Sequence, residues 1–234
     1  LDNGFTPSSI IVDGPFVIDQ GAGLGKWKPS NYSNKFYGPS TMRLGLEKSR
    51  NLMTVRLAQH IGMDKVAETA ERLGVVDDLP EHLSLALGAG ETTVLRLTTA
   101  YAMLVNGGKR ITPTLIDRVQ DHNGETVYRH DQRPCDGCAA TAWHDQPVPF
   151  VPDTREQVVD PISAYQVVSM LEGVVQRGTG VRVAAVGKPL AGKTGTTNES
   201  FDTWFVGFAP DLAVGVFVGF DQPKTLGAKE TGSS

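Results

Sequence analysis

The spacing of apolar residues predicts a series of amphipathic helices. Between residues 51 and 61 an apolar side chain recurs at every third position, which places one stripe on a helix face: Leu52, Val55, Ala58 and Ile61. Gly62 follows as the expected stop. Similar patterns predict helices over residues 40–48 with Ser40 as the cap, over 64–73, from Thr92 or Thr93 to Asn106, and over 161–176.

Runs rich in Val, Ile and Phe predict strands. Thr203 to Ala209 and Leu212 to Phe220, separated by the turn Pro210-Asp211, predict an antiparallel pair. A short strand is expected over residues 10–12, and Asn123-Gly124 predicts a hairpin turn.

Residues 21–37 carry Gly, Pro, Asn, Ser and aromatic residues without periodicity, which predicts a long loop. Loops of this length in compact domains often line functional sites. The most distinctive part runs from Trp27 to Tyr32, which we expect to form a packed aromatic anchor rather than to contact a substrate.

The composition narrows the classes of protein to which the chain could belong. Its 234 residues suffice for one large domain, and 40% hydrophobic residues allow a buried core. The net charge of −4 and the lack of a basic stripe with interleaved aromatics argue against nucleic-acid binding. No apolar run reaches the length of a membrane span, and no signal peptide is visible. Because the chain begins with Leu1 rather than Met, we expect a piece of a longer protein.

Two cysteines, Cys135 and Cys138, lie in a polar loop between His130 and His144. The pair has three interpretations: a local disulfide or free pair, a zinc site, or a redox motif. No thioredoxin-like strand–helix pattern surrounds the pair, so we favour the first. No metal or cofactor is expected.

The segment Lys193-Thr194-Gly195-Thr196-Thr197 precedes the predicted strand pair and carries the strongest chemical signal. A cation and hydroxyls on a strand beside a cleft can bind a carboxylate. The glycine lets a substrate backbone approach, and a free backbone N–H nearby can face a developing oxyanion. The alternative is a solvated lysine on an edge strand.

Ser49-Arg50-Asn51 lies at the join between two predicted helices. Residues two apart on a continuous helix point away from each other. At a break, the side chains of Ser49 and Asn51 can converge on one site. The alternative is that Ser49 simply caps the second helix.

These two segments resemble two of the three motifs of the penicillin-binding protein and serine β-lactamase superfamily: Ser-x-x-Lys, Ser-x-Asn and Lys-Thr-Gly. Further stretches follow in the order seen in the transpeptidase domain of class A penicillin-binding proteins: Asp2 to Pro7, Trp27 to Tyr32, Leu85 to Gly90, Gly192 to Asn198 and Asp202 to Gly207. The chain resembles that domain over nearly its whole length.

The resemblance implies an α+β fold, with an antiparallel sheet flanked by helices and truncated at both ends, over residues 1–234. It implies a D,D-transpeptidase that cross-links peptidoglycan stem peptides ending in D-Ala-D-Ala through a serine acyl-enzyme, and that binds β-lactams. The alternatives are a D,D-carboxypeptidase or β-lactamase-like hydrolase and a non-catalytic penicillin-binding sensor.

The resemblance also implies a role for each site residue. Ser49 would relay a proton to the leaving nitrogen, and Asn51 would bind the substrate amide and steady a catalytic lysine. Lys193 would supply positive potential and protons. Thr194 and Thr196 would bind the substrate carboxylate, and the Thr196 N–H would contribute about 3 kcal/mol as half of an oxyanion hole. The remaining substrate-binding residues would be Gly195 and Thr197.

One motif is absent: no serine is followed three residues later by lysine. The resemblance places this nucleophile segment just before Leu1, so another chain or preceding residues would have to supply it. The chain by itself is predicted to be inactive. The resemblance further implies a parent with an N-terminal membrane anchor and a glycosyltransferase domain, located at the periplasmic face of the inner membrane.

Overall fold

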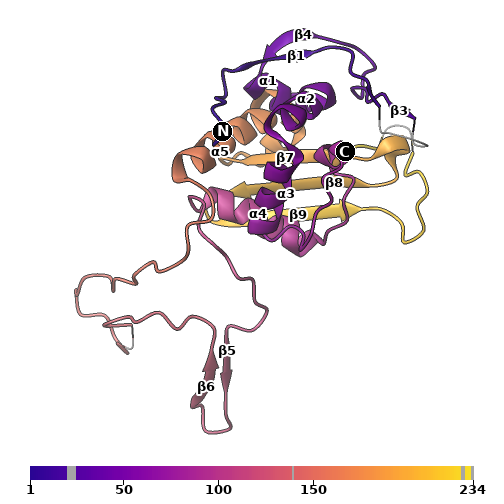
Figure 1. The fold of residues 1–234 in the computed structure, drawn as a ribbon. Coiled ribbons are helices and arrows are strands. Elements are labelled where there is room, and N and C mark those ends of the chain that lie inside the picture. Colours follow the sequence, from indigo (N-terminus) through magenta and orange to yellow (C-terminus); the bar gives the residue numbers. More distant parts are fainter. Residues whose placement is uncertain (20–24, 139, 228–229, 233–234) are drawn as a thin grey trace.

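The computed structural model describes residues 1–19, 25–138, 140–227 and 230–232. Its main sheet is antiparallel, with strands β7 (Ala191–Thr196), β8 (Thr203–Ala209) and β9 (Leu212–Val218) in that order (Figure 1). The predicted strand pair is therefore confirmed, although β9 ends at Val218 rather than Phe220. Lys193 lies in β7, at one edge of this sheet.

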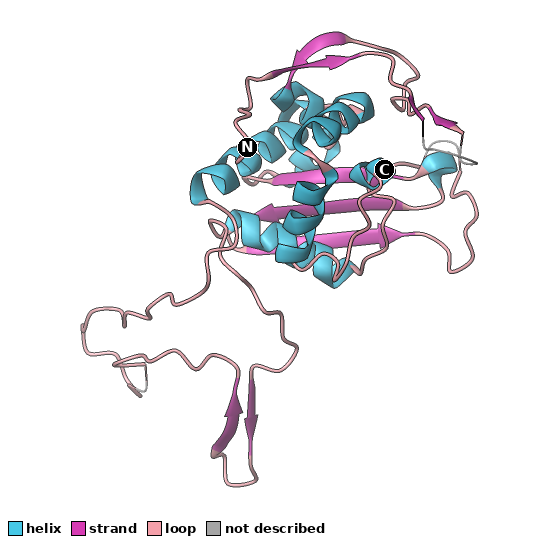
Figure 2. Cartoon of the chain, in the orientation of Figure 1, coloured by secondary structure: helices cyan, strands magenta, loops and turns pink. Residues whose placement is uncertain are grey.

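Helices α4 (Val94–Val105) and α5 (Pro161–Arg177) pack on one face of this sheet. Ala191, Phe208 and Ala213 are successive cross-strand partners, so their side chains share that face. Both helices pack against them with apolar side chains: Tyr101 and Leu104 from α4, Leu171 and Val174 from α5. The arrangement confirms an α+β fold built on an antiparallel sheet (Figure 2).

A second group of elements is built around helix α2 (Asn51–Ile61), which lies beyond the β7 edge of the main sheet (Figure 1). It comprises β1 (Ile10–Asp13) paired with β4 (Gly38–Thr41), β2 (Ile18–Asp19) paired with β3 (Lys26–Trp27), and the helices α1 (Met42–Glu47), α2, α3 (Met63–Arg72) and η1 (Leu83–Leu87). Leu52 and Val55 of α2 are fully buried against Phe16, and Trp27 packs on this cluster. The loop expected over residues 21–37 thus contains a short strand; part of it lies outside the described residues.

The cap of α1 differs from the prediction. Ser40 lies in β4 opposite Ile11, so it belongs to a strand pair. The cap is Thr41, whose hydroxyl accepts a hydrogen bond from the N–H of Leu44 at 3.2 Å.

Helix α3 begins at Met63, directly after Gly62, rather than at the predicted Asp64. Of the two predicted caps of α4, Thr92 and Thr93, the structure shows Thr93, whose hydroxyl accepts a hydrogen bond from the N–H of Arg96.

Residues 111–157 form an arm that extends away from the helices and the main sheet (Figures 1 and 2). The arm contains the predicted hairpin, with β5 (Arg118–Gln120) paired to β6 (Thr126–Arg129). Cys135 and Cys138 are joined by a disulfide. Within the described part of the chain, no cluster of His, Cys, Asp or Glu could hold a metal ion. None of the described helices is long and apolar enough to span a membrane.

The two remaining short helices connect these elements to the main sheet. Helix η2 (Val181–Val186) follows α5 and precedes β7. Helix η3 (Asn198–Ser200) connects β7 to β8.

Asn31 ties the loop before β4 to the start of α2. Its amide nitrogen donates to both carboxylate oxygens of Asp13, at 2.7 and 3.0 Å, and to the carbonyl of Lys35. Its amide oxygen accepts from the N–H of Leu52 at 3.3 Å. Asp13 is 0% exposed and lies 3.9 Å from Arg50. Asn31 therefore supplies the cap that the residue before α2 does not provide with its own side chain.

Replacing Asn31 should destabilise the protein strongly. We expect Asn31→Ala to lower the free energy of unfolding by about 3 kcal/mol, because a buried carboxylate loses its donors. Urea denaturation measures the change. Lys35→Ala, in an exposed side chain of the same loop, should change it by less than about 0.5 kcal/mol. Equal losses in the two variants would contradict the assigned role.

Candidate active site

Ser49 lies at the turn between α1 and α2, in a left-handed backbone conformation with a φ of 53°. Its N–H donates to the carbonyl of Leu46, and the N–H of Arg50 donates to that of Gly45. This is the hydrogen-bond pattern of a Schellman motif, in which glycine usually occupies the left-handed position. A serine there costs about 1–2 kcal/mol of conformational energy. Such strain is typical of functional positions.

The capping interpretation of Ser49 is wrong. The residue before α2 is Arg50, and no side chain of its own caps the helix. Instead, the Ser49 hydroxyl accepts a hydrogen bond from Lys193 Nζ at 2.7 Å. The two predicted segments, distant in sequence, therefore meet.

Lys193 is held between the sheet and the helices. Besides the bond to Ser49, its Nζ donates to the carbonyl of Thr194 at 2.9 Å. Burial lowers the pKa of Lys193 to about 8, because the charged ammonium loses contact with water. The interpretation as a solvated edge lysine is therefore wrong. At neutral pH the side chain is mostly charged, with a minor neutral fraction able to accept a proton.

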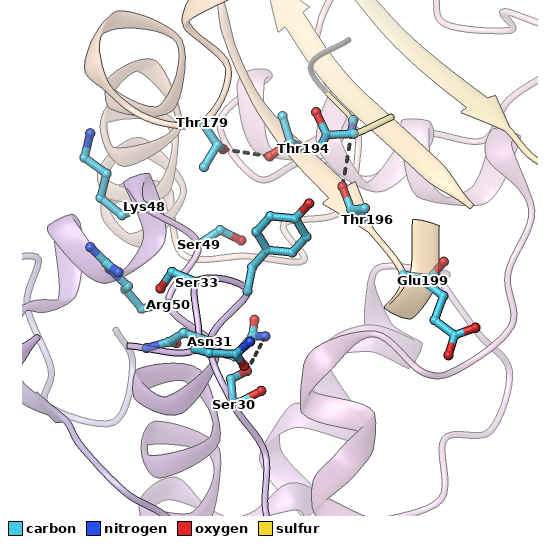
Figure 3. Close-up of a pocket in the computed structure, with 16 residues that line it drawn as sticks. Ser30, Asn31, Ser33, Lys48, Ser49, Arg50, Thr179, Thr194, Thr196 and Glu199 are labelled. Atoms are coloured by element: carbon cyan, nitrogen blue, oxygen red, sulfur yellow. Dashed lines mark hydrogen bonds between the residues drawn. The ribbon is translucent and has the colours of Figure 1, made fainter. Parts of the chain in front are cut away.

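A pocket of about 520 Å³ opens beside this contact (Figure 3). Five predicted site residues line it: Ser49, Asn51, Thr194, Thr196 and Thr197. A larger groove of about 1140 Å³ adjoins the pocket and is lined by the other two predicted residues, Lys193 and Gly195. The two spaces share Asn51 and the threonines of β7. The structure thus brings all seven predicted residues to one region.

The three threonine hydroxyls have different partners. The hydroxyl of Thr194 lies 2.6 Å from that of Thr179 (Figure 3). The hydroxyl of Thr196 accepts from the N–H of Gly232 at 3.2 Å. The hydroxyl of Thr197 accepts from the N–H of Asp202 at 2.8 Å and donates to its carbonyl. Thr197 is therefore engaged in the turn to β8, whereas Thr194 is held by a residue from outside the sheet.

The N–H of Thr196 points toward the open edge of the sheet. In an antiparallel pair, successive residues alternate between bonding their partner and facing away. The N–H of Thr197 bonds the carbonyl of Asp202, and Thr196 is the next residue in register, opposite Thr203. The alternation leaves the Thr196 N–H on the cleft side of the strand, where it can donate a hydrogen bond to an anionic oxygen.

Asn51 lies at the first turn of α2, two residues after Ser49. Its amide nitrogen donates to the carbonyl of Ser30 at 2.9 Å, which fixes the side chain against the loop that carries Asn31. Asn51 lines both the pocket and the groove. Its contacts with substrate and with a second lysine stay predictions.

Sequence reasoning missed most of the other residues that line the pocket, among them Tyr32 and Thr179. Tyr32 is 72% exposed and lines the pocket, so the anchor prediction is correct for Trp27 and wrong for Tyr32. Thr179 also lines the pocket, just past the glycine that ends α5. Its contact with Thr194 joins residues from different elements, so no local sequence pattern could predict it. For Tyr32, the polar neighbours Ser30, Asn31 and Ser33 could have indicated an exposed position.

The chain matches a known family over its whole length. The model for "Penicillin binding protein transpeptidase domain" covers residues 1–234, so the chain belongs to this family. It is 47% identical to penicillin-binding protein 1A of Rickettsia bellii and 35% identical to penicillin-binding protein 1A of Pseudomonas aeruginosa. These alignments cover 100% of this chain but only 30% and 32% of those relatives. The resemblance to class A penicillin-binding proteins is therefore confirmed.

Solved structures share the fold. The crystal structure of penicillin-binding protein 1A from Haemophilus influenzae matches with a TM-score of 0.84 and 31% identity, covering 100% of this chain and 38% of that one. The PonA1 protein of Mycobacterium tuberculosis, solved in complex with penicillin V, matches with a TM-score of 0.74 and 23% identity, covering 95% of this chain and 58% of that one. At that identity the second match supports the fold alone.

The lowered pKa of Lys193 leads to a pH prediction. The pKa of a lysine in the unfolded chain is about 10.4, whereas burial lowers the pKa of folded Lys193 to about 8. Between these values only the unfolded chain keeps the proton, so the contribution of Lys193 to the free energy of unfolding rises with pH across this window. The NMR shift of the lysine Nζ should titrate with a midpoint near 8. In Lys193→Met, the free energy of unfolding should not rise with pH across this window. An NMR midpoint at the pKa of an unfolded lysine would contradict the buried placement of Lys193.

The left-handed conformation of Ser49 leads to a comparison of two variants. Ser49→Gly and Ser49→Ala both lose the hydroxyl, so the difference between them reports the backbone alone. We expect Ser49→Gly to be about 1 kcal/mol more stable than Ser49→Ala in urea denaturation, because only glycine adopts this conformation without strain. If Ser49→Ala were as stable as Ser49→Gly, the turn would not have the described conformation.

Proposed function

We propose that this chain contributes the carboxylate-binding and proton-relay part of a serine D,D-transpeptidase, which cross-links peptidoglycan stem peptides ending in D-Ala-D-Ala. The observation that carries the proposal is the 2.7 Å bond from Lys193 to Ser49, beside a row of threonines on an edge strand. Family membership supports the transpeptidase activity. Membership of a family named for penicillin binding supports β-lactams as ligands, since they mimic the same peptide end.

The substrate would lie along the open edge of β7. Its terminal carboxylate would accept hydrogen bonds from the hydroxyls of Thr194 and Thr196, with Lys193 adding positive potential. Gly195 would let the substrate backbone approach, Asn51 would bind an amide of the substrate, and Thr197 would form the end of the site. The N–H of Thr196 would stabilise the oxyanion of the tetrahedral intermediate.

Ser49 would carry a proton rather than attack. A serine outside residues 1–234 would attack the carbonyl of the penultimate D-Ala, passing its proton to the lysine of the same Ser-x-x-Lys segment. The bond to the terminal D-Ala would break as Ser49 donates a proton to its nitrogen. Ser49 would regain a proton from Lys193, which already donates to its oxygen. An amine from a neighbouring stem peptide would then attack the ester of the acyl-enzyme. The amine proton would return through Ser49 to Lys193, and the departing serine oxygen would take back the proton held by the lysine of its own segment.

The nucleophile would reach this site from the groove beside Lys193. The groove is lined by apolar side chains such as Leu97, Val206 and Phe217, together with Lys193 itself. A Ser-x-x-Lys segment seated there, from residues before Leu1 or from another chain, would bring its serine next to Ser49. The parent protein is proposed to carry a membrane anchor and a glycosyltransferase domain and to act at the periplasmic face of the inner membrane.

Labelling with a fluorescent penicillin tests the proposal. The chain by itself should remain unlabelled, because it lacks the attacking serine. The parent polypeptide should be labelled at one serine outside residues 1–234, identified by mass spectrometry of the labelled peptide.

Covalent labelling of any serine within the chain would contradict this assignment, and so would an unlabelled parent. Product analysis with a donor peptide and an added amine would distinguish the transferase from a hydrolase. A parent that releases only the hydrolysed peptide would be a carboxypeptidase.

A further inference from the structure

The loop after α5 joins the turn that carries Ser49 to the strand that carries Lys193. The N–H of Thr179 donates to the carbonyl of Glu47 at 3.1 Å. Arg177 forms two hydrogen bonds with the Glu47 carboxylate, and Lys48 donates to the carbonyl of Arg177. The loop is thus attached to the end of α1, directly before Ser49.

This attachment depends on close approach of the two backbones. The side chain of Glu47 is only 2% exposed, under α5. A Cβ at Gly178 would lie 2.4 Å from the carbonyl oxygen of Glu47, and a Cβ at Gly173 would lie 2.1 Å from the Glu47 carboxylate. At Gly178 the obstructing atoms are backbone, so no side chain fits there, whereas a side chain at Gly173 would displace the buried Glu47 carboxylate. Glycine at these positions therefore allows α1 and the end of α5 to fix Thr179 in place.

The Thr179 hydroxyl faces the hydroxyl of Thr194 at 2.6 Å (Figure 3). A hydroxyl has one proton and two acceptor positions, so one of the pair donates and the other keeps its own proton free. The Thr194 proton is free for a ligand only when Thr179 is the donor. The bond from Thr179 would then also restrict the direction in which the Thr194 O–H points.

We propose that Thr179 is a positioning residue for the substrate carboxylate, and that it acts through the hydroxyl of Thr194. The proposal rests on the function proposed above. Thr179 donates to Thr194, and Thr194 in turn donates to the carboxylate. The attachment to Glu47 fixes the position of Thr179 and Thr194 relative to Ser49. The carboxylate-binding hydroxyl and the proton-carrying hydroxyl therefore keep a constant separation.

The test uses the parent polypeptide and four variants: Thr179→Val, Thr179→Ser, Thr194→Val and the Thr179→Val/Thr194→Val double variant. The rate constant of acylation is measured with benzylpenicillin and with its methyl ester, which lacks the carboxylate charge. Thr179→Val should slow acylation by benzylpenicillin about tenfold, the equivalent of one hydrogen bond, and leave the ester nearly unchanged. Thr179→Ser should restore most of the rate. In the Thr194→Val background, Thr179→Val should have no further effect.

Two results would overturn the proposal. One is an equal loss for benzylpenicillin and its ester, which a general structural defect would cause. The other is a multiplicative loss in the double variant, which would make Thr179 an independent contact.

A crystal structure of the Thr179→Val parent gives a readout that does not depend on acylation. The Thr194 side chain should rotate away from its position in the unmutated protein, and an unchanged rotamer would contradict the relay. If the unmutated parent were not acylated at all, the proposed function would fail, while the rotamer of Thr194 would still decide the role of Thr179.

Discussion

The hydrogen bond from Lys193 to Ser49 is the contact on which the site depends. It joins the edge strand of the sheet to a turn between two helices, across 144 residues of sequence. Burial at this junction lowers the pKa of the lysine to about 8, so the ammonium is charged at neutral pH yet close to giving up its proton. The role proposed for Lys193, which is to attract a carboxylate and also to pass a proton, needs both properties.

Two connections hold this junction from opposite sides. On one side, Asn31 binds the buried carboxylate of Asp13 and the first turn of α2, which fixes the backbone after Ser49. On the other side, the loop with Thr179 binds the end of α1, which fixes the backbone before Ser49. The strained φ of Ser49 is therefore maintained by structure on both sides, which is consistent with the proton-relay role proposed for this residue.

Much of the fold could be predicted because its signals are local. The apolar stripe of α2 and the glycine after α5 placed those helices well, and Asn123-Gly124 identified its hairpin. The capping residue of α1 could not be placed as reliably, because Ser40 and Thr41 are adjacent and both suitable. Pairing of β4 with β1 decides between them, and that pairing is a tertiary contact. The motifs located Ser49 and Lys193, whereas Thr179 and the two roles of Asn31 depend on contacts between distant elements.

The most direct measurement is a crystal structure of the parent protein acylated by benzylpenicillin. The ligand carboxylate should lie within hydrogen-bonding distance of the hydroxyls of Thr194 and Thr196, with Lys193 still bonded to Ser49. An acylated protein whose ligand carboxylate contacts neither threonine, or in which Lys193 and Ser49 are separated, would contradict the central role of this junction.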